Sequence, residues 1–167
     1  MNAAAPATSV PAPLWRRLAA LGYDLVAVLA LVLAIGLLCQ LAAGGELIAT
    51  QGGHLAAPWW YPALQLAAVA TYFALSWTRG GQTLGMRPWR TRVTAAGDAL
   101  GAGRALARFA LAASPLLLLA LGRALDARGV LVAMALAWAL DFAVALIDRQ
   151  RRALHDILAG TAVELRR

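Results

Sequence analysis

The feature that most limits the fold of this chain is an apolar stretch that runs without a charge from Leu25 to Gln40, directly after an aspartate. An α-helix rises about 1.5 Å per residue, so Asp24 would lie about 10 Å deeper than Arg17, on the same helix face. A carboxylate at that depth in a membrane-spanning helix costs about 2.5–3.5 kcal/mol on insertion scales. The sequence therefore predicts a membrane span and a compensating partner for Asp24.

The composition excludes an ordinary soluble domain. Of the 167 residues, 62% are hydrophobic and 14% are charged, whereas soluble proteins average about 25% charged. A span needs about 20 mostly apolar residues, and four apolar blocks are candidates: 18–41, 59–77, 105–122 and 130–147. We therefore predict an all-α membrane protein whose domain, 14–165, is a bundle of four transmembrane helices.

The third block admits two arrangements. Between Arg108 and Arg123 only 109–122 is free of charge, which covers about 21 Å against a hydrocarbon core of about 30 Å. Either both arginines extend to the membrane surfaces and the block spans, or the third and fourth blocks form a hairpin that enters from one side.

The basic residues predict the orientation. All fifteen are arginine, and the net charge is +7. With four spans, thirteen of the fifteen fall on the side of the two termini, and cytoplasmic loops are rich in basic residues. Both termini are therefore expected to be cytoplasmic. Because the arginines are spread through loops and no nucleic-acid motif is present, we expect no nucleic-acid partner.

The terminal segments and the loops also contain residues that predict local structure. Residues 1–13 lack charge and are rich in Ala and Pro, which predicts a disordered cytoplasmic tail that ends at Pro13, a residue suited to a helix start. Residues 148–167 form a predicted cytoplasmic C-terminal segment. Two strand-like stretches, Arg90–Ala95 and Thr161–Leu165, adjoin turn residues. We predict that they pair as a small β-ladder beneath the membrane.

Two intramembrane acids and three arginines lie at similar depths near the inner surface. Asp141 is about 9 Å inside the end of the fourth block, and Arg104 and Arg108 share a helix face at the start of the third. We predict a buried ionic cluster in which Asp24 and Asp141 face Arg17, Arg104 or Arg108. Such groups commonly serve a function, but ion pairs also fix helix packing, and the residues leave both interpretations open.

Two loop motifs have structural interpretations. His155 and Asp156 could be an acid–base pair or metal ligands, but no second acidic or histidine group is near, and Asp156 as a helix cap is favoured. The Gly80–Gly85 loop matches no phosphate-binding pattern, so its glycines are expected to form a turn at the membrane surface. We predict no metal, no cofactor and no enzymatic activity.

Three patterns, in this order, resemble the RDD family of bacterial membrane proteins. The resemblance covers about Pro13 to Leu165. The patterns are Arg17-x-x-Ala20-x-x-x-Asp24, Gly81-Gln82-Thr83-Leu84-Gly85-Met86, and the stretch from Arg152 to Thr161 that contains His155-Asp156. The one arginine and two aspartates that name the family would here be Arg17 (rather than Arg16), Asp24 and Asp156. The resemblance implies a bacterial inner-membrane protein and transport of an unidentified ligand, since at least one relative looks like a cation/proton antiporter.

The leading hypothesis is therefore a transporter, coupled to a cation or proton. In it Asp24, together with Asp141, alternates between protonation and pairing with an arginine. Four short helices would need a homo-oligomer to surround a pathway; the other expected partners are the lipid bilayer and a small ligand or cation. The alternative is a non-transporting scaffold or assembly subunit whose Asp–Arg pairs are structural.

Overall fold

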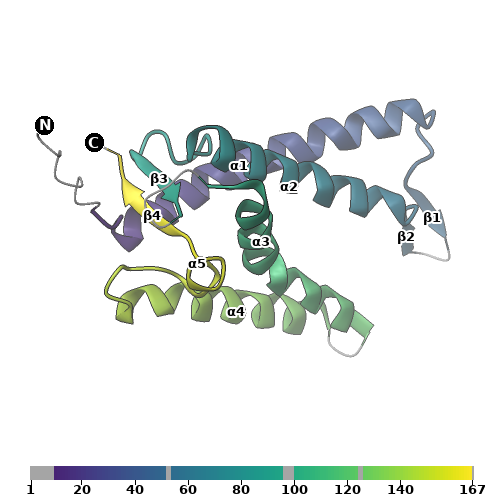
Figure 1. Ribbon diagram of the computed structural model, residues 1–167. Coiled ribbons are helices and arrows are strands. Elements are labelled where there is room, and N and C mark those ends of the chain that lie inside the picture. The colour runs from purple at the N-terminus through teal and green to yellow at the C-terminus, as the bar shows by residue number, and fades with distance from the viewer. Residues whose placement is uncertain (1–9, 52–53, 96–99, 124–125, 167) are drawn as a thin grey trace, which may run out of the picture.

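The computed structural model describes residues 10–51, 54–95, 100–123 and 126–166. Its elements, in chain order, are α1 (Leu14–Ala42), β1 (Ala49–Gln51), β2 (His54–Ala56), α2 (Trp60–Gly80), β3 (Thr91–Thr94), α3 (Ala102–Ala113), the 3-10 helix η1 (Ser114–Arg123), α4 (Ala127–Ile147), α5 (Leu154–Leu158) and β4 (Ala162–Leu165). Helices α1 and α2 pack side by side, and α3 leads from them towards α4 (Figure 1). Strands β3 and β4 lie at the opposite end of the molecule from β1 and β2 (Figure 1).

Helix α1 exposes most of its large apolar residues and buries two charged ones, Arg17 and Asp24. Pro13 precedes its first turn, as expected. Leu29 and Leu33, further along, are each more than half exposed. The buried residues of the helix share one face at spacings of three and four: Arg17, Ala20 and Asp24. This inverted distribution suits a helix that is surrounded by lipid and meets its polar partners inside the protein.

Three helical segments of the described chain are long and apolar enough to cross a bilayer: Leu14–Ala42, Ala102–Leu119 and Ala127–Ile147. Helix α2, which corresponds to the second predicted span, has 21 residues like α4 but is not one of these three. It carries Gln65 and Thr71 in its middle, and such residues lower its hydropathy. A membrane crossing by α2, and with it the four-helix bundle and the orientation of the termini, stays a prediction.

The third apolar block changes its helix type half-way. Helix α3 ends at Ala113, and η1 continues through a Ser114-Pro115 step. Proline has no N–H for the α-helical pattern, and a 3-10 helix rises about 2.0 Å per residue, so the block reaches further than an α-helix of equal length. It packs on α4, and the Trp138 indole donates to the Ala112 carbonyl at 2.9 Å.

The predicted β-ladder is confirmed. Strands β3 and β4 are antiparallel, with Val93 opposite Val163. The chain before α1 adds to the other edge of β4, because the Ala12 amide donates to the Val163 carbonyl and the Leu165 amide donates to the Val10 carbonyl, both at 2.9 Å. Residues 10–12 are therefore part of the sheet rather than of a disordered tail, and 1–9 lie outside the described residues.

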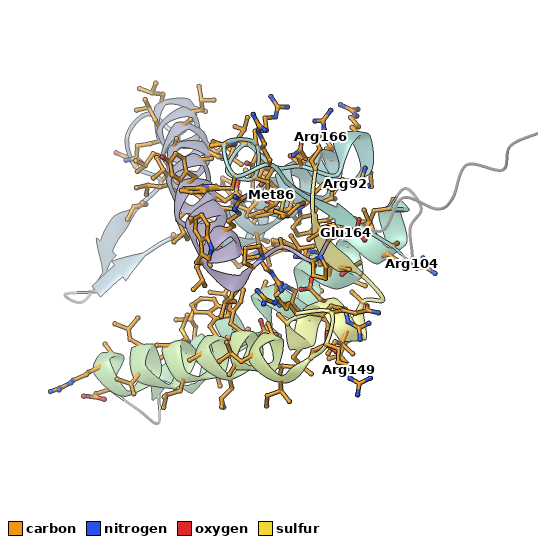
Figure 2. The ribbon with its side chains drawn as sticks, turned by 90° about the vertical axis from the view of Figure 1, so that its left-hand side faces the viewer. Met86, Arg92, Arg104, Arg149, Glu164 and Arg166 are labelled. Carbon is orange, nitrogen blue, oxygen red and sulfur yellow. The ribbon has the colours of Figure 1, made fainter. Side chains whose placement is uncertain are left out.

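A small apolar core joins this sheet to the helices. Met86, in the loop after α2, lies between α1 and the sheet (Figure 2). The other buried members of the core come from all the surrounding elements: Ala12, Ala20, Trp77, Val93, Ala95, Leu100, Ala105 and Val163. The core therefore holds loop 81–86 against the buried face of α1, where the polar residues lie.

Candidate functional site

Asp24 accepts hydrogen bonds from three neutral donors. The Tyr72 hydroxyl on α2 and the Gly85 amide donate to Oδ1, both at 2.9 Å, and the Thr83 hydroxyl donates to Oδ2 at 2.5 Å. Asp24 is 4% exposed, and it forms no ion pair with any residue that the structure describes. Loop 81–86 and α2 thus take the place of the predicted arginine partner.

Backbone amides orient the two hydroxyls. The Met86 amide donates to Thr83 Oγ1 at 3.3 Å, and the Leu84 amide donates to Tyr72 Oη at 3.2 Å. Each hydroxyl therefore accepts one hydrogen bond and gives its own proton to Asp24. Hydrogen bonds connected in this way polarise one another, so the loop is organised around an acceptor at position 24.

Glycine is required at two positions of the loop for different physical reasons. Gly81 ends α2 with φ 68°, a left-handed conformation that favours glycine. Gly85 passes so close to α1 that an added Cβ would overlap the Ala20 carbonyl oxygen and lie 2.7 Å from Cγ of Asp24. The expectation of a simple surface turn omitted this second role, which places an amide against the carboxylate.

A second buried group joins α1, α3 and α5. Asp156 is fully buried and pairs with Arg17 through Oδ2 and with Arg108 through Oδ1. The two arginine side chains are 4% and 5% exposed. Asp156 Oδ2 also accepts from the Ala153 amide at 3.1 Å, which is the capping contact expected at the start of α5. Arg108 Nη1 donates further to the Thr161 hydroxyl at 3.0 Å, so one carboxylate fixes three helices and the chain leading to β4.

Asp141 and His155 connect α4 to this group. His155 Nδ1 lies 2.6 Å from Asp141 Oδ2, and the His155 amide donates to Oδ1 at 2.8 Å. Nε2 of the same ring lies 3.5 Å from Asp156 Oδ1. Burial lowers the pKa of His155 below its ordinary value, and the hydrogen bond with Asp141 only partly opposes this effect.

We expect the protein to lose stability as the pH falls below about 6.5, the ordinary pKa of histidine. Between that value and the lower folded-state pKa of His155, the unfolded chain binds more protons than the folded one. A charged His155 would also face Arg17 and Arg108, besides Asp141 and Asp156. Melting temperatures in detergent between about pH 8 and about pH 5 measure the effect. His155→Gln should weaken the dependence, and an identical fall in the variant would contradict the prediction.

The structure divides the predicted cluster in two. Asp24 is bound by loop 81–86 and Tyr72, and Asp141 by His155, so neither contacts an arginine side chain among the described residues. Arg104 is exposed and points away from the molecule (Figure 2). The two remaining arginines of the prediction share Asp156, which the prediction had left outside the cluster. A role for any of these residues in coupling to an ion stays a prediction.

The chemistry of the two groups differs. Around Asp24 lie carboxylate and hydroxyl oxygens, which are the ligands that hard cations prefer. The Asp156 carboxylate, in contrast, is already paired with two guanidinium groups. Within the stretches that the structure describes, no three His, Cys, Asp or Glu side chains are grouped as metal ligands. The arrangement can therefore hold a proton or a small cation at Asp24, and helices together at Asp156.

No curated protein and no solved structure matches the chain. A family model described as the RDD family matches residues 11–160. The match begins at Pro11, which bridges to β4, and it includes both aspartates and both arginines of the two buried groups. The chain therefore belongs to the RDD family.

Proposed function

We propose that this protein is a transporter of the bacterial inner membrane that couples the movement of a small ligand to a proton or a small cation at Asp24. Membership of the RDD family and three helices able to cross a bilayer indicate a membrane protein. The arginine distribution supports cytoplasmic termini. Because the chain has few helices, we include a homo-oligomer in the proposal.

One observation carries the proposal. Asp24 is buried in an apolar helix, and all its hydrogen-bond partners among the described residues are neutral. A carboxylate there needs positive charge, which hydroxyl and amide donors supply only in part. Arg17, on the same face of α1, is already paired with Asp156. A bound proton or cation would supply the missing charge.

Competition of two ions for this carboxylate would provide the coupling. The hydroxyls of Thr83 and Tyr72 can rotate, so each can turn its proton away from Asp24 and offer a lone pair to a cation. A proton on Asp24 neutralises the carboxylate and so removes its attraction for a cation. A cation bound to the carboxylate in turn disfavours the proton. Exchange of a proton for a cation at one site is the minimum that antiport requires.

The Asp156 group would form the rigid part of such a transporter. Its carboxylate is paired with two buried guanidinium groups, and it ties α1 to α3 and α5. Asp24 lies two turns from Arg17 on α1. Movement of loop 81–86 could therefore open the Asp24 site while the end of α1 stays in place.

Asp24→Asn is expected to reduce coupled ion flux to background while the protein remains folded. Asparagine has the same shape, and its carbonyl oxygen can still accept a hydrogen bond, but it carries no charge. Purified protein in liposomes with a trapped pH dye, given Na⁺, K⁺ or Li⁺ gradients, measures the flux.

The matched control is Asp148→Asn, which removes a partly buried carboxylate just after α4 and should leave flux unchanged. Wild-type protein without flux for all three cations, or Asp24→Asn with full flux, would refute coupling at Asp24.

A scaffold or assembly subunit is the second candidate. It is favoured by the two backbone amides that orient the hydroxyls, because this arrangement would hold an ionised Asp24 without a mobile ion. In that case Asp24→Asn would lower the melting temperature, and the wild-type protein would show no flux.

A further inference from the structure

A pocket that carries three arginines lies beside the loop that holds Asp24. Its volume is about 600 Å³, and the residues that line it come from the end of α2, the following loop and the chain after β4: Gly80, Gln82, Arg87, Arg90 and Arg166. None of these lining residues is acidic. The pocket therefore presents donors and positive charge.

The positive charge of the pocket is not matched within the protein. Arg87, Arg90 and Arg166 form no salt bridge with any described residue, whereas Arg92, on the neighbouring strand, lies 3.7 Å from Glu164. Like charges in one concave site repel each other and attract an anion. The favoured ligand is therefore negatively charged.

A buried glutamine orients one of the arginines. Gln82 Oε1 accepts from Arg166 Nη1 at 2.7 Å, and Gln82 Nε2 donates to the Thr91 carbonyl at 2.7 Å. The backbone of Arg166 is held as well, because its amide donates to the Arg90 carbonyl at 2.7 Å. Arg166 is therefore positioned before any ligand binds, which also explains a glutamine in the Gly-Gln-Thr motif.

The other two arginines are presented by a strained turn. Arg90 has φ 51°, in the left-handed region that residues other than glycine seldom adopt. Its amide donates to the Arg87 carbonyl at 3.2 Å, and both residues line the pocket. Strain of this kind is concentrated at binding sites.

Aromatic residues indicate the depth of the pocket in the membrane. Trp89, between the two arginines of the turn, packs edge-on against Trp15 at 5.6 Å and Tyr23 at 6.0 Å between ring centroids. Trp15 and Tyr23 are 56% and 55% exposed. Exposed indole and phenol rings favour the headgroup level, where the anions are lipid phosphates.

We propose that Arg87, Arg90 and Arg166 bind a phosphate group, and that an anionic phospholipid headgroup supplies it. Guanidinium groups bind phosphate oxygens through paired, charge-assisted hydrogen bonds. A soluble phosphate ester has the same chemistry, but the aromatic residues beside the pocket favour the lipid. The inference does not depend on the proposed transport function.

The test compares wild type with an Arg87→Gln/Arg90→Gln double variant and with Arg104→Gln. Arg87 and Arg90 make no side-chain hydrogen bond with a described residue, so glutamine removes charge without removing a hydrogen bond. Arg104 is a matched exposed arginine away from the pocket. Lipid adducts by native mass spectrometry and melting temperatures are recorded with phosphatidylglycerol, phosphatidylcholine or glycerol 3-phosphate.

Wild type and Arg104→Gln should bind and be stabilised by phosphatidylglycerol but not by phosphatidylcholine. The double variant should melt like wild type without lipid and bind phosphatidylglycerol about tenfold or more weakly. Equal stabilisation by glycerol 3-phosphate would retain the phosphate site and overturn the lipid assignment. Undiminished binding of both phosphate compounds by the double variant would overturn the site itself.

Discussion

Replacing Asp156 by asparagine is expected to remove about 3–5 kcal/mol of folding free energy, because Arg17 and Arg108 would stay buried without their shared counter-charge. Asparagine can still accept the hydrogen bond from the Ala153 amide at the start of α5, so the loss reports the charge rather than the cap. Typical stabilities are about 5–15 kcal/mol. We therefore expect a much lower melting temperature in detergent and poor accumulation in membranes.

Asp148→Asn is the control for this variant. Hydrogen bonds from Arg152 lower the pKa of Asp148 to about 2, so it too is ionised at neutral pH. It is only partly buried, and its partner Arg152 reaches solvent, so its loss should change melting little. Removing all three charges, with Arg17→Met and Arg108→Leu added, should restore part of the stability because no charge then remains buried. Equal losses in the Asp148 and Asp156 variants would contradict charge burial as the cause.

Gly85→Ala is expected to have the second large effect, about 1–3 kcal/mol of lost stability from overpacking. Its methyl group would overlap the Ala20 carbonyl oxygen and press on the Asp24 carboxylate. The loop must then withdraw from α1, which also breaks the hydrogen bond from the Gly85 amide to Asp24. Thermal melting measures the stability, and the liposome assay measures the accompanying loss of flux.

The matched glycine variant is Gly103→Ala in α3, where an added Cβ meets no atom within 4 Å. Alanine favours a helix over glycine by about 1 kcal/mol, so this variant should melt at the same temperature or higher. If both variants melt like wild type, loop 81–86 is not in close contact with α1.

The type and spacing of neighbouring residues in the sequence predicted the sheet and the buried face of α1. The stretches around Val93 and Val163 alternate and adjoin turn residues, and they pair in the structure. Helical spacing placed Arg17 and Asp24 on one face, and both are buried. Each strand and the helix face depend on residues close together in the sequence, whereas the pairing joins two distant segments.

The choice of partners could not be read from the sequence in the same way. Two aspartates, Asp24 and Asp141, lie at similar expected depths, and Asp156 was expected in the cytoplasmic segment. Helical spacing says which way Arg17 points but not which carboxylate meets it. Asp24 is held by two hydroxyls and an amide, and these groups occur throughout any chain without a periodic signature. Only the close approach at Gly85, visible in three dimensions, identifies the loop as its partner.

The pairing of Arg17 with Asp156 has a consequence for biosynthesis. The two residues are 139 positions apart, so a ribosome delivers α1 to the insertion machinery long before the counter-charge exists. Strand β4, on which residues 10–12 lie, follows later still. Until the chain beyond Asp156 emerges, water, lipid headgroups or other proteins must therefore solvate Arg17 in place of its final partner.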